Sequence, residues 1–321
     1  MKKKYFAVAA GIVVVVAVVL AIAFSVKTET KTDYAMNTVV TFTVTSRNPN
    51  EDIDAALKEI KRIDALMSIS STKGDVYKIN SAKSGTAVKV SKETFSLIEM
   101  SLDVSQKTEG AFDITVNPLT ELWNINSPNP KVPEDNRIKD ALSKISYKNV
   151  VLDKEKSTVT LTEEGMSINL GAVAKGYAAD RVADILKKRN VTDAIVDLGG
   201  NIYALGEEKN IGIQTPFEAR GNYFTTCKVK DESVVTSGAY ERYFEQNGKK
   251  YHHILNTKNG YPAQSGISGA TVISKNSALA DALSTAIFAM GEEKTREVIS
   301  GFENVRVIIL KDNGKVVRID N

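Results

Sequence analysis

The chain has 321 residues, a formal net charge of +3 and a single cysteine. Because lysine and arginine are interspersed with aspartate and glutamate, the charge pattern does not indicate a nucleic-acid-binding protein. One cysteine excludes an intrachain disulfide and a cysteine-based metal site. The length is enough for one large domain or two closely packed lobes.

The N-terminal part predicts a membrane anchor. Lysines at positions 2–4 precede residues 6–24, nineteen consecutive apolar residues that are long enough to span a bilayer core as a helix. A cleaved signal peptide is the alternative, because 21–23 has the small-x-small pattern of a cleavage site, although the apolar run exceeds a usual signal core. The basic residues come first, so we expect the rest of the chain outside the cytoplasm, at the cell membrane. The predicted segments are therefore a basic end at 1–5, the anchor at 6–24, a polar linker at 25–33 and one domain over 34–321.

Hydrophobic periodicity predicts the secondary structure of that domain. Apolar residues at helical spacing predict helices over 52–67, 92–108, 138–145 and 277–290. Alternating or buried runs predict strands over 39–44, 159–161, 166–170, 194–198, 211–214, 224–229, 233–236 and 251–255, and a hairpin of 305–310 with 316–319. The mixed order of helices and strands agrees with an α+β fold and does not specify which one.

The stretch 169–180 is a predicted strand-to-helix turn. The residues up to Leu170 alternate as in a strand, and an amphipathic helix follows Val173. Gly171 and small alanines lie between them, and Lys175 comes just before a glycine, an order that excludes a P-loop. Free N–H groups at a helix start, together with a lysine, favour an anion. A helix start whose small residues serve only tight packing is the alternative interpretation.

Three other places carry polar side chains suited to chemistry. Asp113 lies in an apolar run and needs partners if it is buried, and capping a turn is the alternative role. Asp281 and Thr285 are four residues apart on a predicted helix and share a face; a carboxylate with a hydroxyl suits Mg²⁺, and a solvated aspartate beside a packed threonine is the alternative. His252 and His253 would face opposite sides of a strand, one of them on the surface, and without a third histidine they cannot build a zinc site.

Eight sequence blocks, in order, resemble the FAD:protein FMN transferases, the ApbE-like flavin transferases. The match runs from about residue 33 to 321. The blocks are MNT at 36–38, D at 64 with MS at 67–68, GAFDITV at 110–116 with PL at 118–119 and LW at 122–123, NLGAVAKGY at 169–177, DLGGN at 197–201, TSG at 236–238, HIL at 253–255 with G at 260, and ADALSTA at 280–286.

This resemblance implies an activity and a fold. The activity is Mg²⁺-dependent transfer of the FMN part of FAD to a threonine hydroxyl of a target flavoprotein, with release of AMP. The fold is a mixed α+β, single two-lobed domain with a largely antiparallel sheet and packed helices, related to the T-fold, with FAD between the lobes. Three alternatives remain open: a pyrophosphatase that hydrolyses FAD to FMN and AMP, a non-catalytic FAD carrier, and a surface scaffold, which would leave the Asp281 and Thr285 pair unexplained.

The resemblance also implies roles for individual residues. The Mg²⁺ ligands would be the side chains of Asp281 and Thr285 with the carbonyls of Ala172 and Ser284. FAD-contacting positions would be Met36, Ala111, Phe112, Asp113, Asn169, Lys175 and Leu255, with Thr236, Ser237 and Gly238 lining the site.

The resemblance leaves one catalytic role to assign, and two positions of this chain differ from the family pattern. With Asp281 assigned to the metal and Asp113 to FAD, His253 remains as the hypothetical base for the threonine proton; orienting or packing are its alternative roles. Ser70 stands where relatives often carry an aromatic residue that stacks on the flavin, so stacking would be weaker or Tyr240 would replace it. Asn169 is neutral where some relatives carry a charge.

Overall fold

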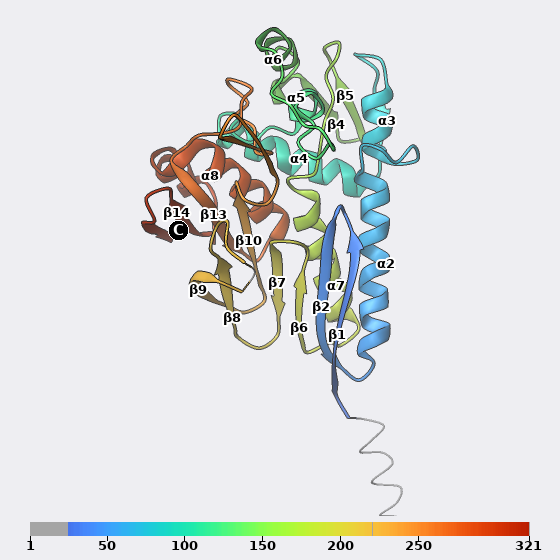
Figure 1. Ribbon diagram of the computed structural model, residues 1–321. Coiled ribbons are helices and arrows are strands. Elements are labelled where there is room, and N and C mark those ends of the chain that lie inside the picture. Colours follow the sequence, from blue (N-terminus) through green and yellow to red (C-terminus); the bar gives the residue numbers. More distant parts are fainter. Residues whose placement is uncertain (1–24, 220, 321) are drawn as a thin grey trace, which may run out of the picture.

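The computed structural model describes residues 25–219 and 221–320 (Figure 1). The anchor expected over 6–24 lies outside these ranges. Within them, no helix combines the length and apolar character that a membrane crossing requires.

The polar segment at 25–33 is not a linker, because most of it belongs to strand β1 (Lys27–Ala35). β1 pairs antiparallel with β2 (Thr38–Ser46) over its whole length. Threonines on the same face of the two strands bond across the ladder, as in Thr30 with Thr43 at 3.0 Å between their hydroxyl oxygens. Such cross-strand pairs of β-branched residues stabilise a polar strand that has one exposed face.

The main structure is an eight-stranded sheet in which every neighbouring pair is antiparallel (Figure 1). The predicted largely antiparallel sheet is therefore confirmed. In spatial order its strands are β1, β2, β6 (Asp193–Asp197), β7 (Asn201–Leu205), β10 (Glu232–Gly238), β13 (Ile267–Ser274), β14 (Arg306–Lys311) and β15 (Val316–Asp320).

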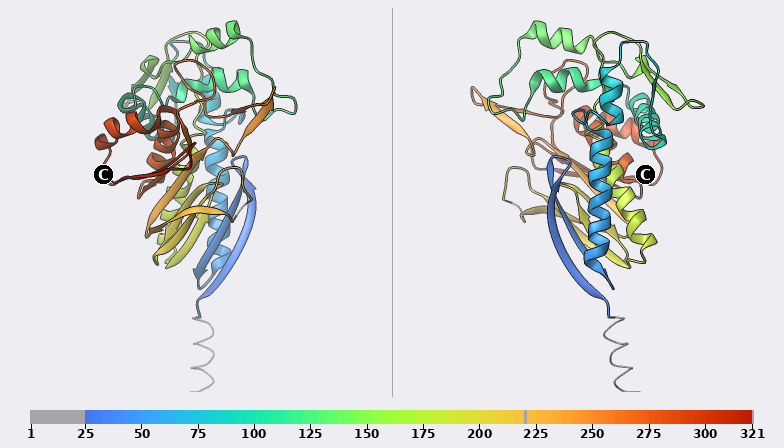
Figure 2. Two further views of the ribbon diagram at one scale, coloured as in Figure 1. Left: turned by 60° about the vertical axis from the view of Figure 1, so that its left-hand side comes forward. Right: turned by 90° about the vertical axis from the view of Figure 1, so that its right-hand side faces the viewer.

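Three helices cover one face of this sheet: α2 (Pro49–Met67), α7 (Ala174–Lys188) and α8 (Ser277–Val298) (Figure 2). Alternate residues of a strand point to opposite faces, and neighbours in β10 accordingly join different cores. Val235 packs in the core below the helices, whereas Val234 packs under the hairpin of β8 (Lys209–Gln214) and β9 (Tyr223–Val229). The sheet is thus covered on both faces over part of its width.

The second lobe holds shorter elements at one end of the sheet (Figure 2). Part of this lobe has a core of its own around Trp123, which is 1% exposed and donates from its indole nitrogen to the Gly260 carbonyl at 2.7 Å. The elements are α3 (Asp75–Ser81), β3 (Val88–Lys89), α4 (Lys92–Lys107), η1 (Ile114–Val116), α5 (Asn117–Trp123), α6 (Asp135–Leu142), η2 (Tyr147–Asn149), β4 (Val150–Asp153), β5 (Thr158–Leu161) and the hairpin of β11 (Tyr243–Gln246) and β12 (Lys249–His252); η3 (Ile299–Gly301) follows α8.

Two predicted strands differ from the structure. The segment 166–170 forms no strand, because its backbone is paired by a side chain instead: Asn80 donates to the Ile168 carbonyl and accepts from the Ile168 N–H, both at 2.8 Å. The strand predicted over 251–255 is β12, which ends at His252. The five predicted helices correspond to α2, α4, α6, α7 and α8, and α8 continues past a break at Gly291, where φ is +83°.

Candidate active site

A large cleft of about 1310 Å³ opens between the two lobes. Its walls come from segments that are distant in the sequence: the β1–β2 turn, 111–126, the turn before α7, the β8–β9 hairpin, the segment after β10, 253–257, and one face of α8. The predicted site residues meet here. Those that line the cleft are Met36, Ala111, Phe112, Asp113, Asn169, Ala172, Lys175, Thr236, Ser237, His253, Leu255, Asp281 and Thr285.

The first turns of α7 and α8 are joined by reciprocal hydrogen bonds. The Gly176 N–H, which has no partner within its helix because it lies in the first turn, donates to Asp281 Oδ2 at 2.9 Å. In return, Asp180 accepts from the N–H groups of Ser277 and Ala278 at 2.8 and 2.9 Å. The helices approach so closely that a Cβ on Gly176 would lie 2.2 Å from the Ser277 carbonyl oxygen. This junction fixes Asp281 in the cleft wall.

Asp281 and its neighbours offer hard oxygen atoms for a cation. The Asp281 carboxylate is 4% exposed, and burial raises its pKa. Apart from the Gly176 bond, its charged contact is Lys175 Nζ, 3.8 Å from Oδ1. Thr285 lies one helical turn further along α8, with its hydroxyl oxygen 3.4 Å from that of Ser237. A single carboxylate with neutral oxygens suits Mg²⁺, which keeps several waters and takes few protein charges.

Two further observations limit this set of oxygen donors. Ser284 does not line the cleft; its hydroxyl donates to the Asp281 carbonyl at 2.9 Å and lies 2.8 Å from the Ser237 hydroxyl. Within the described part of the chain, no three His, Cys, Asp or Glu side chains gather as a metal cluster. The donor set thus fits a hard divalent cation that also binds substrate oxygens, and does not fit a soft metal.

The turn before α7 is held by side-chain bonds. Asn169 Oδ1 accepts from the Gly171 N–H at 2.8 Å, and its amide nitrogen donates to Asn117 at 3.2 Å. Lys175 Nζ donates back to the Gly171 carbonyl at 3.2 Å. This arrangement presents Ala172 and Lys175 to the cleft at the N-terminus of a 15-residue helix, whose dipole favours an anion. The expected free N–H groups are mostly taken, because those of Val173 and Ala174 donate to the Leu170 carbonyl and that of Gly176 donates to Asp281.

Asp113 has the capping role that the sequence left open, and it also lies in the cleft wall. Its Oδ1 accepts from the N–H and the hydroxyl of Thr115 at 2.8 and 2.7 Å, and its Oδ2 accepts from the Tyr147 N–H at 2.8 Å. Burial raises its pKa, and these bonds oppose that shift by favouring the carboxylate. Asp113 therefore shapes the wall that Ala111 and Phe112 present.

The two histidines have different environments. His253 Nδ1 lies 3.3 Å from the Arg242 carbonyl oxygen; because a carbonyl only accepts, Nδ1 carries the proton and Nε2 keeps a free lone pair. Burial, followed by the charge of Arg242, lowers the pKa of His253 to about 3. The expectation that one histidine is a surface residue is wrong, because His252 is buried, bonds the Ala263 carbonyl at 3.0 Å and packs edge-on against Phe288.

Sequence reasoning missed two residues of the cleft, Glu241 and Arg242, in the segment after β10. Arg242 donates to the Asn37 carbonyl at 3.2 Å and ties the β1–β2 turn to the opposite wall. Glu241 is exposed on the cleft wall without a hydrogen bond or ion pair to the described residues, and partial desolvation in the cleft raises its pKa above the ordinary glutamate value. The sequence signal that could have identified them is a pair of adjacent, oppositely charged residues shortly after a buried strand.

Two further predictions concerned this same segment. Gly238 does not line the cleft; the ring of Tyr240 packs against it so closely that a Cβ there would lie 2.2 Å from the ring. Tyr240 itself lines the cleft, whereas Ser70 does not. Gly238 therefore is not a wall residue, but its lack of a side chain leaves space for the Tyr240 ring, which is an aromatic residue of the cleft wall.

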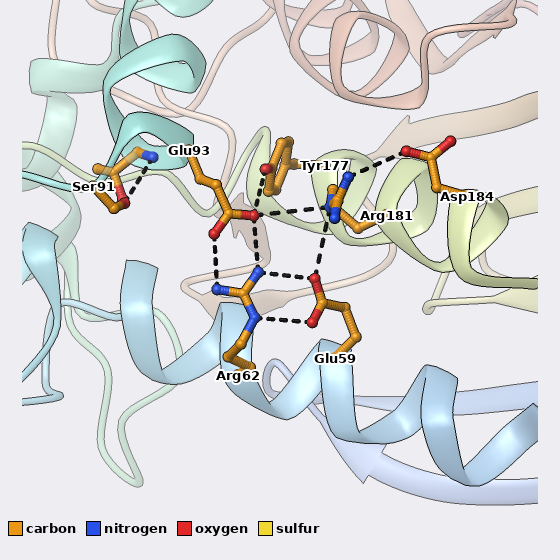
Figure 3. A network of polar contacts seen from close by, with 8 residues as sticks. Glu59, Arg62, Ser91, Glu93, Tyr177, Arg181 and Asp184 are labelled. Carbon is orange, nitrogen blue, oxygen red and sulfur yellow. Dashed lines mark hydrogen bonds and ion pairs between the residues drawn. The ribbon is translucent and has the colours of Figure 1, made fainter. Parts of the chain in front are cut away.

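A charged network anchors the other side of α7 (Figure 3). Tyr177 donates to Glu93 at 2.9 Å, and Arg62 bridges Glu93 and Glu59 with four bonds of 2.8 Å. Arg181 lies between the same two glutamates. Because these side chains come from α2, α4 and α7, the network holds the helix that carries Lys175 against both lobes.

Known proteins resemble this chain in sequence and in structure. The ApbE family model matches residues 36–309. An FAD:protein FMN transferase of Klebsiella pneumoniae is 37% identical over 80% of this chain and 81% of its own length, and one of Treponema pallidum is 31% identical over 91% and 86%. The crystal structure of the ApbE protein from Thermotoga maritima superposes with a TM-score of 0.84 at 35% identity, covering 91% of this chain and 97% of that one. A flavin transferase ApbE from Vibrio cholerae, 22% identical, shares the fold with a TM-score of 0.80 over 92% and 98% of the two chains. The chain therefore belongs to the ApbE family, and like these relatives it is a transferase.

Proposed function

We propose that this chain transfers the FMN part of FAD to a threonine hydroxyl of a target flavoprotein and releases AMP, with Mg²⁺ as cofactor. One observation carries the proposal: hard oxygen donors, a lysine and a helix N-terminus converge on one wall of a cleft that is large enough for a dinucleotide. The printed names of the relatives, FAD:protein FMN transferases, support the same reaction.

The cation would be held by the Asp281 carboxylate, the Thr285 hydroxyl and the carbonyl of Ala172, which line the cleft, whereas Ser284 does not. Bound Mg²⁺ supplies charge neutralisation for the diphosphate and its leaving group. Lys175 would bind phosphate oxygens, and the dipole of α7 would favour their negative charge. Met36, Asn169 and Leu255, with 111–113, would hold the rest of FAD, and Tyr240 would supply the aromatic surface that Ser70 cannot.

The transfer forms a bond between the threonine oxygen and the FMN phosphorus and breaks the bond from that phosphorus to the oxygen that leaves with AMP. The threonine proton must go to a base, because a neutral hydroxyl is a poor nucleophile. His253 Nε2 is the candidate, since its lone pair is free and the residue lines the cleft. A pKa near 3 makes it a weak base in the empty cleft, and the negative diphosphate would raise that pKa by opposing Arg242 and Lys175.

The proposal is tested by mass spectrometry. The full chain is incubated with FAD and Mg²⁺, with and without a flavoprotein acceptor of a related transferase. Transfer adds FMN to the acceptor and releases AMP. Free FMN with AMP and no adduct would identify a pyrophosphatase, in which water replaces the threonine, and FAD bound without any cleavage would identify a carrier. Either of those outcomes refutes transfer.

We also infer that residues 6–24 anchor the chain in the cell membrane, with the catalytic domain outside the cytoplasm. The inference rests on the length of the apolar run and on the lysines that precede it.

A further inference from the structure

Exposed apolar side chains gather around the mouth of the cleft. Among the described residues, nine large apolar side chains are more than a third exposed, and six of them belong to this region. Tyr34, Val39, Ile69 and Tyr223 line the cleft, and Phe217 and Tyr243 lie just outside it; Val26, Val151 and Val316 are elsewhere. Single exposed apolar residues are ordinary, whereas a group of them marks an interaction site.

Phe217 and Tyr243, which we call the rim patch, are not explained by a ligand inside the cleft. Their rings meet edge-on at 5.6 Å, and Phe217 also contacts Tyr240 at 6.1 Å. Phe217 comes from the β8–β9 hairpin and Tyr243 from β11, so the patch joins two hairpins of different lobes beside the opening. Neither residue lines the cleft, and the rings are 50% and 41% exposed. A bound FAD would therefore leave them open.

The backbone of Phe217 is strained. Its φ is +61°, in the left-handed region that disfavours a bulky side chain. Such a conformation is unfavourable for a residue other than glycine and persists where the surroundings or a function require it. Burial gives no reason here, because half of the ring faces solvent. The strained turn instead displays an aromatic ring at the mouth of the cleft.

A cation completes the patch. Lys250 Nζ lies 3.8 Å from the centre of the Phe217 ring and 5.1 Å from that of Tyr243. It makes no ion pair with the described residues. An aromatic pair with an unpaired ammonium complements a surface that presents apolar side chains and a carboxylate.

We propose that the rim patch, with Lys250, docks the acceptor protein, through an acceptor surface that carries apolar side chains and a carboxylate near the threonine. This inference rests on the proposed function, since transfer requires the acceptor hydroxyl to enter the cleft past this rim. The cleft, at about 1310 Å³, exceeds the ~300–1,000 Å³ of usual small-molecule sites.

The test compares Phe217→Gly and Tyr243→Ser with the matched control Val151→Ser, which alters an exposed apolar residue away from the cleft. Glycine suits a φ of +61°, so Phe217→Gly should fold at least as stably as the wild type while lacking the ring. Three reactions are followed for each variant: hydrolysis of FAD without acceptor, transfer to a folded flavoprotein acceptor of a related transferase, and transfer to a short peptide around its threonine.

We expect kcat/KM for the folded acceptor to fall about tenfold in each patch variant, because truncated interface aromatics commonly cost that much. FAD hydrolysis, transfer to the peptide and the control variant should remain at wild-type values. Lys250→Glu should likewise slow transfer to the folded acceptor and weaken its dependence on salt.

The outcomes separate the two proposals. Wild-type transfer with unchanged Phe217→Gly kinetics would overturn the docking role and leave the proposed function intact. Equal losses with the folded acceptor, the peptide and FAD hydrolysis would also overturn it, by assigning the patch to FAD. A wild-type chain that transfers FMN to neither acceptor would overturn both.

Discussion

Replacing Gly176 with alanine tests whether the α7–α8 junction positions the site. The new Cβ would lie 2.2 Å from the Ser277 carbonyl oxygen and 2.7 Å from Ala278 Cα, against an ordinary contact of 3.4–4 Å. Since the obstructing atoms are backbone, no side chain can move aside, and the two helices must separate by roughly 1 Å. That movement also lengthens the 2.9 Å bond from Gly176 to the Asp281 carboxylate.

The expected change in the free energy of unfolding combines one stabilising and two destabilising contributions. Alanine in place of glycine ordinarily stabilises a helix by about 1 kcal/mol. Overpacking costs about 1–3 kcal/mol, and a weakened hydrogen bond to a buried charge costs about 1.5–3 kcal/mol. We therefore expect Gly176→Ala to lower the free energy of unfolding by about 2–4 kcal/mol, against the direction of helix propensity.

Denaturant unfolding measures this loss, and titration of transfer with Mg²⁺ measures the effect on the site. Gly269→Ala in β13 is the control, because no heavy atom lies within 4 Å of its added Cβ. We expect the control to match the wild type, and Gly176→Ala to need more Mg²⁺ for half-maximal transfer. A Gly176→Ala protein of wild-type stability and unchanged Mg²⁺ dependence would refute the view that this contact sets the position of Asp281.

Four other predictions follow. Asp281→Ala should abolish Mg²⁺-dependent transfer with the fold intact by circular dichroism, and Thr285→Val should cost less because it removes a neutral ligand; full Asp281→Ala activity at low Mg²⁺ would show that the site is misassigned. His253→Asn should keep FAD affinity and slow transfer by ~10² to 10⁴, and should remove an acidic limb from the pH profile of kcat; a loss of FAD affinity in proportion to rate would leave His253 a positioning residue. Partial desolvation in the cleft raises the pKa of Glu241 above its ordinary value near 4.5, so the folded state binds the extra proton and stability falls as pH rises through the raised pKa. Because the side chain is exposed, the effect is small: melting temperatures at pH 5 and 8 should differ slightly less in Glu241→Gln than in the wild type, and a larger difference in the variant would contradict the direction of the shift. Protease added to intact cells should release a fragment that begins near residues 25–33, and protection of that region would overturn the topology.

Local sequence patterns correctly predicted the helices and the shared face of Asp281 and Thr285 on α8. Asp281 and Thr285 were expected on one face because they are four residues apart, and both line the cleft. The start of α4 likewise has a local signal, because the hydroxyl of Ser91 accepts from the Thr94 N–H at 3.2 Å, as serine commonly does at a helix N-terminus. These features depend on neighbours within one or two helical turns, and such information is present in any window of the sequence.

The incorrect and missed predictions involve contacts between residues that are distant in the sequence. Residues 166–170 alternate like a strand, but no strand among the described residues pairs with them, and the Asn80 side chain, 88 positions before Ile168, bonds the Ile168 backbone instead. Asp180 lay in the stretch that the sequence singled out, yet its role as the cap of α8 depends on a helix that begins 97 residues later. No periodicity reports such contacts, because they arise only when the lobes and helices pack.

The charges around His253 imply an order of events under the proposed function. In the empty cleft, burial and the charge of Arg242 hold the pKa of His253 near 3, with Lys175 acting in the same direction, so the residue is neutral and weakly basic at neutral pH. A diphosphate bound at Lys175 opposes both positive charges and raises that pKa. His253 therefore becomes an effective base only when FAD is present, and a threonine that arrives first meets a weakly basic His253. An acidic limb that lies at higher pH in kcat than in kcat/KM for FAD would be the kinetic consequence, because the first reports the FAD-bound enzyme and the second the free enzyme. If the acidic limbs of the two profiles coincide, the diphosphate does not change the pKa of His253. Another group of the cleft would then have to accept the threonine proton, and the candidate would be the Glu241 carboxylate, which has no hydrogen bond or ion pair to the described residues.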